Sequence, residues 1–137
     1  MSEISSGSGA TRWIGYVMTI LPSLFLLSDG VMKLFKPRFV VEATTQLGYH
    51  ESAILPIGII LVICTVLYLI PITSVLGAIL LTGYLGGAVA THVRAGQGSF
   101  PVIFPVIIGV LSWGGLYFRD HRVRNLIPLL TTTQDRI

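Results

Sequence analysis

Four long apolar stretches dominate this sequence, and short polar or proline-containing segments separate them. Only 11% of the 137 residues are charged, whereas an ordinary soluble domain carries about 25% charge. A chain with so little charge cannot cover a water-facing surface, which excludes a soluble globular enzyme. A membrane-spanning helix needs roughly 20 apolar residues. We therefore predict an all-α, integral membrane four-helix bundle, with spans at about residues 11–35, 53–70, 73–93 and 100–118.

The two ends of the chain are polar and lie outside this membrane domain, which we place at residues 11–128. Residues 1–10 are rich in Ser and Gly and lack the basic region of a secretion signal, so we expect a disordered tail followed by a retained span. Residues 129–137 are expected to form a second tail.

The connection between the first two spans contains apolar residues at four-residue intervals, namely Phe39, Ala43 and Leu47. This spacing predicts a short amphipathic helix in the membrane interface, ended by Gly48. An ordinary surface loop fits the same residues.

Basic residues lie mostly at the ends of the spans, which suits membrane headgroups better than nucleic acid and accounts for the net charge of +3. With four spans, both termini lie on one side of the membrane. That side has five basic residues against four on the other, and we expect it to be cytoplasmic. The five are Arg12, Arg119, Arg122, Arg124 and Arg136.

The single cysteine, Cys64, excludes an internal disulfide, a Cys-x-x-Cys redox pair and a cysteine-based metal site. The three histidines are spread over a loop, a span end and the C-terminal tail, which argues against a haem held by two of them. No metalloprotease, NTPase or dinucleotide-binding motif is present. We expect no metal site and no partner nucleic acid.

The third span carries small residues at helical spacing, where close helix contacts are favourable in lipid. We expect these residues to pack against neighbouring helices at the centre of the bundle; an interface between two copies of the chain is the alternative. The predicted packing residues are Gly83, Gly86, Gly87 and Ala90.

Four polar residues should gather at the membrane face opposite the termini, because the first and third spans run in the same direction. Asp29 and Lys33 lie near the end of the first span, and His92 and Arg94 near the end of the third. At 1.5 Å per residue, Asp29 lies about 6 Å below that face. A charge within a span normally faces a partner or a cavity.

Three interpretations of this cluster remain open. The first is an ion-pair clamp that joins the first and third spans. The second is a polar pocket that binds a head group or moves a proton, and the third is an Asp29 that is simply hydrated near the surface. His92 is either a hydrogen-bonding residue at the interface or a proton carrier.

Several segments resemble the DoxX-like family of small bacterial membrane proteins. The third span, LGAILLTGYLGGAVATHVR at residues 76–94, carries the most specific motif, preceded by VLYLIP at residues 66–71. WGGLYFRD at 113–120 and MKL at 32–34 are similar to further family motifs.

The resemblance covers about residues 12–128 and implies four transmembrane helices in the inner membrane. Lys33, His92 and Arg94 match family motif positions. The chain departs from the family near Leu61, where members often carry a glutamate, and at Asp29, where they usually have a small or apolar residue.

The resemblance also implies a function, because better-known relatives act as quinone-reducing subunits or as membrane partners of secreted redox enzymes. We therefore expect an accessory subunit that holds a quinone or similar lipophile for a redox enzyme partner. A small proton-coupled transporter and a scaffold or chaperone for other membrane proteins are the alternatives. No catalytic residue is assigned, and the expected partners are the lipid bilayer, a redox enzyme and a second copy of the chain.

Overall fold

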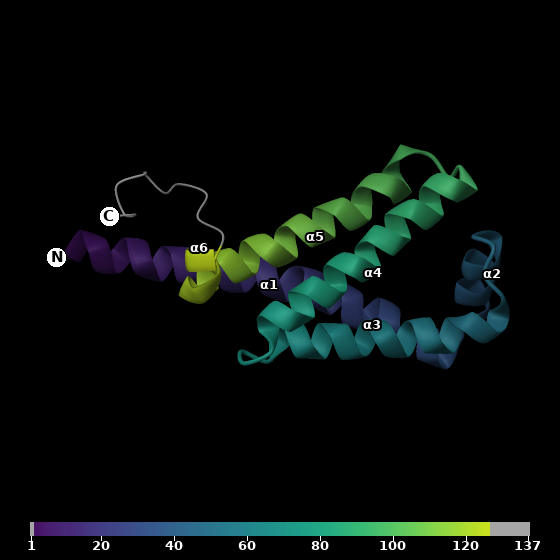
Figure 1. Ribbon diagram of the computed structural model, residues 1–137, viewed down its shortest axis with the longest axis horizontal. Coiled ribbons are helices and arrows are strands. Elements are labelled where there is room, and N and C mark those ends of the chain that lie inside the picture. Colours follow the sequence, from purple (N-terminus) through teal and green to yellow (C-terminus); the bar gives the residue numbers. More distant parts are fainter. Residues whose placement is uncertain (1, 127–137) are drawn as a thin grey trace.

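The computed structural model describes residues 2–126 of the chain, and these residues form helices and connecting turns without a strand (Figure 1). The elements in chain order are α1 (Ser2–Phe35), α2 (Arg38–Gln46), the 3-10 turn η1 (Glu51–Ala53), α3 (Ile54–Leu69), α4 (Ser74–Ala95), α5 (Ser99–Arg119) and α6 (His121–Leu126).

Four helices are long and apolar enough to cross a membrane, which confirms the predicted all-α bundle. The ends of these segments lie within two residues of the predicted ends. The segments are Gly9–Phe35, Glu51–Leu69, Ser74–Ala95 and Ser99–Arg119.

Helix α1 begins at Ser2, within the segment that we expected to form a tail. No proline interrupts residues 2–21, and adding residues to an existing helix costs far less than starting one. The expected C-terminal tail at residues 129–137 lies outside the described residues.

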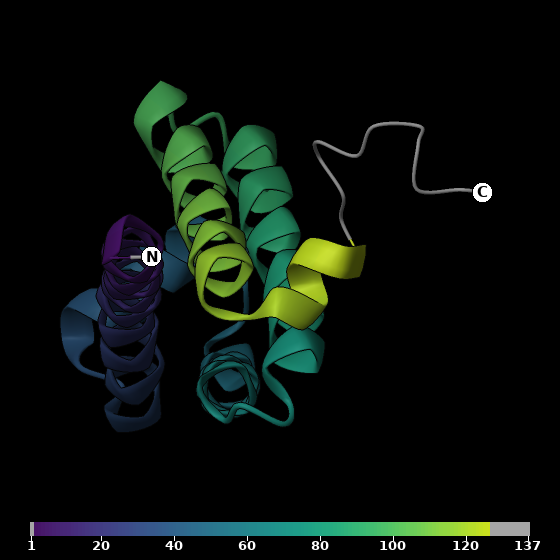
Figure 2. The ribbon, with the colours of Figure 1, turned by 90° about the vertical axis from the view of Figure 1, so that its left-hand side faces the viewer.

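The four long helices form a ring in which α1 contacts α3 and α5, and α4 contacts the same two helices. Helices α1 and α4 therefore lie on a diagonal of the bundle (Figure 2). The α4–α5 hairpin is inclined to α1 and α3, as the side view shows (Figure 1).

Glycines set the closest approaches between these helices. A Cβ atom at Gly115 would lie 2.6 Å from Thr19 Oγ1, which brings α5 against α1. A Cβ at Gly30 would lie 2.7 Å from a Val62 methyl carbon, which brings α1 against α3. At Gly77 a Cβ would collide with the backbone of Tyr68, where α3 turns into α4.

The predicted packing residues of α4 do not occupy the centre of the bundle. No atom lies within 4 Å of a Cβ built at Gly83, Gly86 or Gly87, and these three residues and Ala90 are exposed or nearly so. The expectation of packing within the chain is therefore wrong. The opposite face of α4 packs inward instead, because Leu81 and Leu85 fill the core volume that small side chains would leave empty.

Two short helices close the ends of the bundle. The predicted helix between the first two spans is present as α2, and Gly48 follows its end with a φ of +93°. Its buried residues are Val40 and Thr44, while Phe39 is 61% exposed, so the residues that pack on the protein are not those of the predicted apolar face. At the other end α6 buries Val123.

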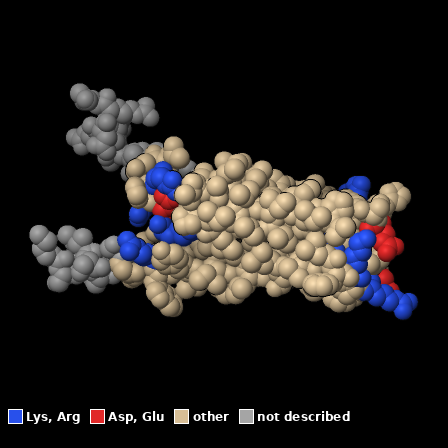
Figure 3. Space-filling view, turned by 90° about the horizontal axis from the view of Figure 1, so that it is seen from below, with Lys and Arg blue, Asp and Glu red and all other residues tan. Residues whose placement is uncertain are grey.

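Charged residues lie at the two ends of the molecule and leave a wide uncharged belt between them (Figure 3). This belt is the surface expected of a protein surrounded by lipid.

Candidate functional site

Asp29 and Lys33 form an ion pair within α1. Lys33 Nζ lies 2.5 Å from Asp29 Oδ2, and the two side chains are 14% and 31% exposed respectively. Helix α3 packs directly on the lysine stem, since a Cβ at Gly58 would lie 2.7 Å from Lys33 Cβ. The Lys33 ammonium group and its partner Asp29 are four residues apart on α1, a spacing that places the two side chains next to each other.

The expected clamp between the first and third spans is not formed by this pair. Asp29 bonds to its own helix, and α1 and α4 are diagonal rather than adjacent. No ion pair in residues 9–126 joins these two helices.

Arg94 and Thr91 tie the end of α4 to the segment after α2. Arg94 Nη2 donates to the backbone carbonyl of Leu47 at 2.8 Å, and the Tyr49 and Thr91 hydroxyls lie 3.0 Å apart. Arg94 thus satisfies a carbonyl at the end of α2 that has no partner within the helix.

His92 lies between Thr91 and Arg94 in the sequence but bonds to the α4–α5 loop. Its Nδ1 is 2.9 Å from Gln97 Oε1, and because an amide oxygen only accepts, Nδ1 is the donor of this hydrogen bond. The four candidate residues thus share one end of the bundle, as expected, but only Asp29 and Lys33 bond to each other.

A small pocket of about 370 Å³ lies beside His92, where α4 turns into α5. Its lining combines the imidazole and the Gln97 amide with loop and helix residues. These are His92, Val93, Gly96, Gln97, Gly98, Ser99, Val102 and Ile103.

A larger apolar groove of about 630 Å³ runs between α4 and α5. It is open to the outside, because Val106 and Val110 on its rim are 51% and 64% exposed. Val123 of α6 lines its end nearest the termini. Gly86 of α4 and Gly109 of α5 both line the groove. Because neither has a side chain, the groove stays wide at this point.

The polar atoms in the middle of the groove are satisfied by protein. Trp113 Nε1 donates to Thr82 Oγ1 at 2.6 Å, and the Thr82 hydroxyl donates to the Ala78 carbonyl at 2.7 Å. A molecule in the groove would therefore contact apolar side chains at this depth.

The groove and the pocket follow one another along the same pair of helices. Val89 lines the groove and Val93, one turn later in α4, lines the pocket. On α5, Val106 lines the groove and Val102, one turn earlier, lines the pocket. The apolar groove and the pocket at His92 are thus one helical turn apart along α4 and α5.

The family model described as the DoxX-like family matches residues 17–115 of the chain. The chain belongs to the DoxX-like family. No curated protein and no solved structure matches it. The matched region of this DoxX-like protein includes the Asp29–Lys33 pair, the pocket at His92 and most of the groove, but ends before Arg119.

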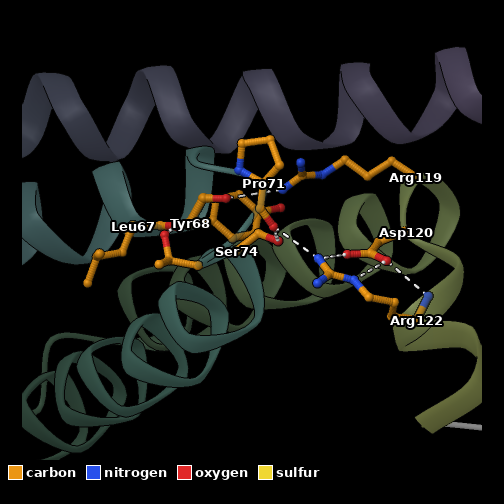
Figure 4. A network of polar contacts seen from close by, with 8 residues as sticks. Leu67, Tyr68, Pro71, Ser74, Arg119, Asp120 and Arg122 are labelled. Atoms are coloured by element: carbon orange, nitrogen blue, oxygen red, sulfur yellow. Dashed lines mark hydrogen bonds and ion pairs between the residues drawn. The ribbon is translucent and has the colours of Figure 1, made fainter.

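A second polar network holds this DoxX-like protein together at the end near the termini (Figure 4). Arg119 Nη2 donates to the Tyr68 carbonyl at 3.1 Å, and Arg122 Nη2 donates to the Pro71 carbonyl at 3.0 Å. Ser74 Oγ donates to the same Pro71 carbonyl. Two arginines from the C-terminal part of the chain thus cap the end of α3 and the turn that follows it.

Asp120 fixes Arg122 in this network. Its carboxylate accepts from Arg122 Nε, Nη2 and backbone N–H at 3.2, 2.9 and 2.9 Å. These hydrogen bonds hold the pKa of Asp120 below its usual range.

The sequence analysis missed both the groove and this network. Trp113 and Gly109 were available as signals, because an aromatic donor and a glycine on one helix can face Thr82 and Gly86 on the next. Arg119 and Arg122 were counted only as interfacial charges, whereas their hydrogen bonds depend on the position of the α3–α4 turn.

Proposed function

We propose that this DoxX-like protein is an accessory subunit of a membrane redox system and that it binds a quinone-class amphiphile along α4 and α5. The observation that carries this proposal is the apolar groove between α4 and α5, with the pocket at His92 one helical turn beyond it. Its volume of about 630 Å³ is within the range of small-molecule sites, about 300–1,000 Å³.

The polarity of the groove favours one orientation of such a ligand. Thr82 and Trp113 already bond to each other, so the hydrocarbon part of the ligand belongs in the groove. The oxygen-bearing ring belongs at the His92 end, where the imidazole and the Gln97 amide supply hydrogen-bonding groups. A histidine there accepts a hydrogen bond from a hydroxyl as the neutral base and donates one to a carbonyl as the cation.

The other candidate residues support this end of the bundle in our proposal. Arg94 holds α4 to the segment after α2. Asp29 and Lys33 pair within α1, where α3 packs on the lysine stem. The partner enzyme supplies the electrons and their donor. We propose that this partner is a redox protein at the same membrane.

We infer that the protein lies in the inner membrane with its termini in the cytoplasm. In the full sequence, five basic residues belong to the terminal side of the four spans and four to the opposite side. The side with more Lys and Arg favours the cytoplasm.

The transporter alternative has weaker support. A proton-coupled carrier needs a carboxylate that can release its partner and become accessible from each side of the membrane in turn. Asp29 is instead bonded to Lys33 on its own helix, near one membrane face.

The experiment that tests the proposal uses Trp113 fluorescence in lipid nanodiscs, with Trp13 replaced by Phe so that only one indole reports. Titration with ubiquinone-2 should quench this fluorescence in a saturable manner. Gly86→Leu should weaken binding about tenfold or more, because the new side chain projects into the groove.

Gly83→Leu is the matched control, because Gly83 also has open space beyond its Cα but does not line the groove. It should bind like the parent. His92→Ala should weaken binding without lowering Tm. Equal quinone binding by the Gly86→Leu and Gly83→Leu variants would refute the groove as the site, and a failure to saturate would favour a scaffold role.

A further inference from the structure

Ser23 carries a buried hydroxyl group that has no hydrogen-bond partner among residues 9–126. The residue is 3% exposed, and its Oγ is one of two buried side-chain polar atoms in this part of the chain without such a partner. A buried hydroxyl that forms no hydrogen bond has lost its contacts with water without compensation, which costs free energy. Ser23 therefore marks a place in the bundle where hydrogen-bonding capacity is still open.

Six other serine and threonine residues of the four long helices bond to their own backbone. Each hydroxyl donates to the carbonyl four residues earlier, at 2.7–2.9 Å, and these residues are Thr19, Ser28, Thr65, Thr82, Thr91 and Ser112. Ser23 forms no such bond to the carbonyl of Thr19. Its side chain therefore adopts a different orientation from the other six.

Ser23 lies on the face of α1 that packs into the bundle. Thr19, one turn earlier, and Leu26, about one turn later, are 3% and 2% exposed. Thr19 Oγ1 lies 3.5 Å from the Tyr68 hydroxyl of α3 and 2.6 Å from a Cβ built at Gly115 of α5. Ser23 therefore lies one turn farther along the same interface with α3 and α5.

Helix α3 places a second buried hydroxyl at the level of Ser23. The two helices are antiparallel, because Thr19 lies beside Tyr68, whereas a Cβ at Gly58 would lie 3.0 Å from the Gly30 carbonyl oxygen. One turn after Thr19 in α1 thus corresponds to about one turn before Tyr68 in α3. This is the position of Thr65, which is 0% exposed.

Helix α5 places a third buried hydroxyl at the same level. Thr19 packs on Gly115, and α1 and α5 are also antiparallel. One turn farther along α1 therefore corresponds to about one turn earlier in α5, which is the position of Ser112. This residue is 2% exposed, and its hydroxyl donates to the Ile108 carbonyl at 2.9 Å.

We propose that Ser23, Thr65 and Ser112 bind a water molecule in the interior of the membrane domain. The hydroxyls of Thr65 and Ser112 donate to helix carbonyls, but their oxygens keep lone pairs that accept hydrogen bonds. A water molecule that donates to these two oxygens and accepts from Ser23 makes three hydrogen bonds, and about three is typical of a buried water. The site lies between α1, α3 and α5 and does not rest on the proposed quinone site.

The first test is the effect of Ser23→Ala on thermal unfolding in detergent. If Ser23 bonds to a bound water, the variant removes one of the partners of that water, and Tm should fall by about 3 °C or more. If the hydroxyl is unpartnered, the same change removes an unsatisfied buried group and should raise Tm. Ser28→Ala is the matched control, because its exposed hydroxyl bonds to the Leu24 carbonyl and its loss should leave Tm nearly unchanged.

The second test is an experimental structure in lipid nanodiscs at a resolution that shows ordered water. We expect density within hydrogen-bonding distance of Ser23 Oγ, and we expect this density to be absent from the Ser23→Ala variant. An unchanged or raised Tm of that variant would overturn the proposal. So would a map that shows ordered water elsewhere in the protein but none at Ser23, or a Ser23 hydroxyl bonded to the Thr19 carbonyl.

Discussion

Arg119 joins the end of α5 to the end of α3 through Tyr68, since its Nη2 donates to the Tyr68 carbonyl at 3.1 Å and its guanidinium lies 5.2 Å from the centre of the Tyr68 ring. The Tyr68 hydroxyl in turn donates to the Ser112 carbonyl at 2.5 Å. Backbone and side chain of one tyrosine are thus both bonded to α5, at two levels of the same interface.

Replacing Arg119 by Leu should destabilise the protein by about 1–3 kcal/mol, because it leaves the Tyr68 carbonyl without its donor. Arg119→Lys should recover only part of this loss, because a single ammonium does not reproduce the planar group over the ring. Thermal unfolding in detergent measures the effect. Arg124→Leu, which removes an exposed arginine, should change stability by less than about 0.5 kcal/mol, and equal losses in both variants would contradict the capping role.

The Asp120–Arg122 pair should make stability depend on acidity. The pKa of Asp120 is lowered in the folded protein, so its stabilising contribution is fully present above the ordinary aspartate pKa of about 3.9 and is lost as the pH falls through the lower folded pKa. Asp120→Asn removes the carboxylate at every pH. The difference in Tm between wild type and variant should therefore shrink between about pH 5 and pH 3, and a difference that stays constant over this interval would argue against the pair as its source.

Two glycines of α4 should respond in opposite directions to the same substitution. Gly77→Ala places a methyl group against the Tyr68 backbone, and overpacking of this kind costs about 1–3 kcal/mol or more. Gly87→Ala meets no atom within 4 Å and should stabilise the helix by up to about 1 kcal/mol. Unfolding by added denaturing detergent gives both values, and a loss of stability in the Gly87 variant would show that this face is covered by a second copy or another partner.

The Asp29–Lys33 pair should behave as one unit. Asp29→Asn leaves a mostly buried ammonium without its carboxylate and should cost about 1–3 kcal/mol. Lys33→Met in addition to Asp29→Asn should restore part of that loss. A double-mutant cycle on Tm and on quinone binding measures the coupling, and strictly additive effects would mean that the 2.5 Å contact contributes nothing.

Much of the fold was predictable because the bilayer imposes a length on each apolar segment. The spans, the α3–α4 hairpin and the end of α2 at Gly48 all followed from runs of apolar residues and their interruptions. The common location of Asp29, Lys33, His92 and Arg94 followed from the direction of the spans alone.

The choice between the two small-residue faces of α4 was not predictable for a physical reason. In water the apolar face of a helix marks the protein interior, but in lipid both faces are apolar. Gly77 and Gly83 therefore look alike in the sequence, although one contacts the Tyr68 backbone and the other faces outward. The groove depends on this choice, and so does the correct placement of Gly86.

The groove between α4 and α5 opens sideways, through the rim that Val106 and Val110 form. A molecule that enters by this route comes from the lipid phase and never has to leave it. Its supply is then set by its content in the membrane, where a lipophilic molecule reaches far higher concentrations than in water. A modest intrinsic affinity is enough to keep such a groove occupied, and exchange between neighbouring proteins becomes a matter of diffusion in two dimensions.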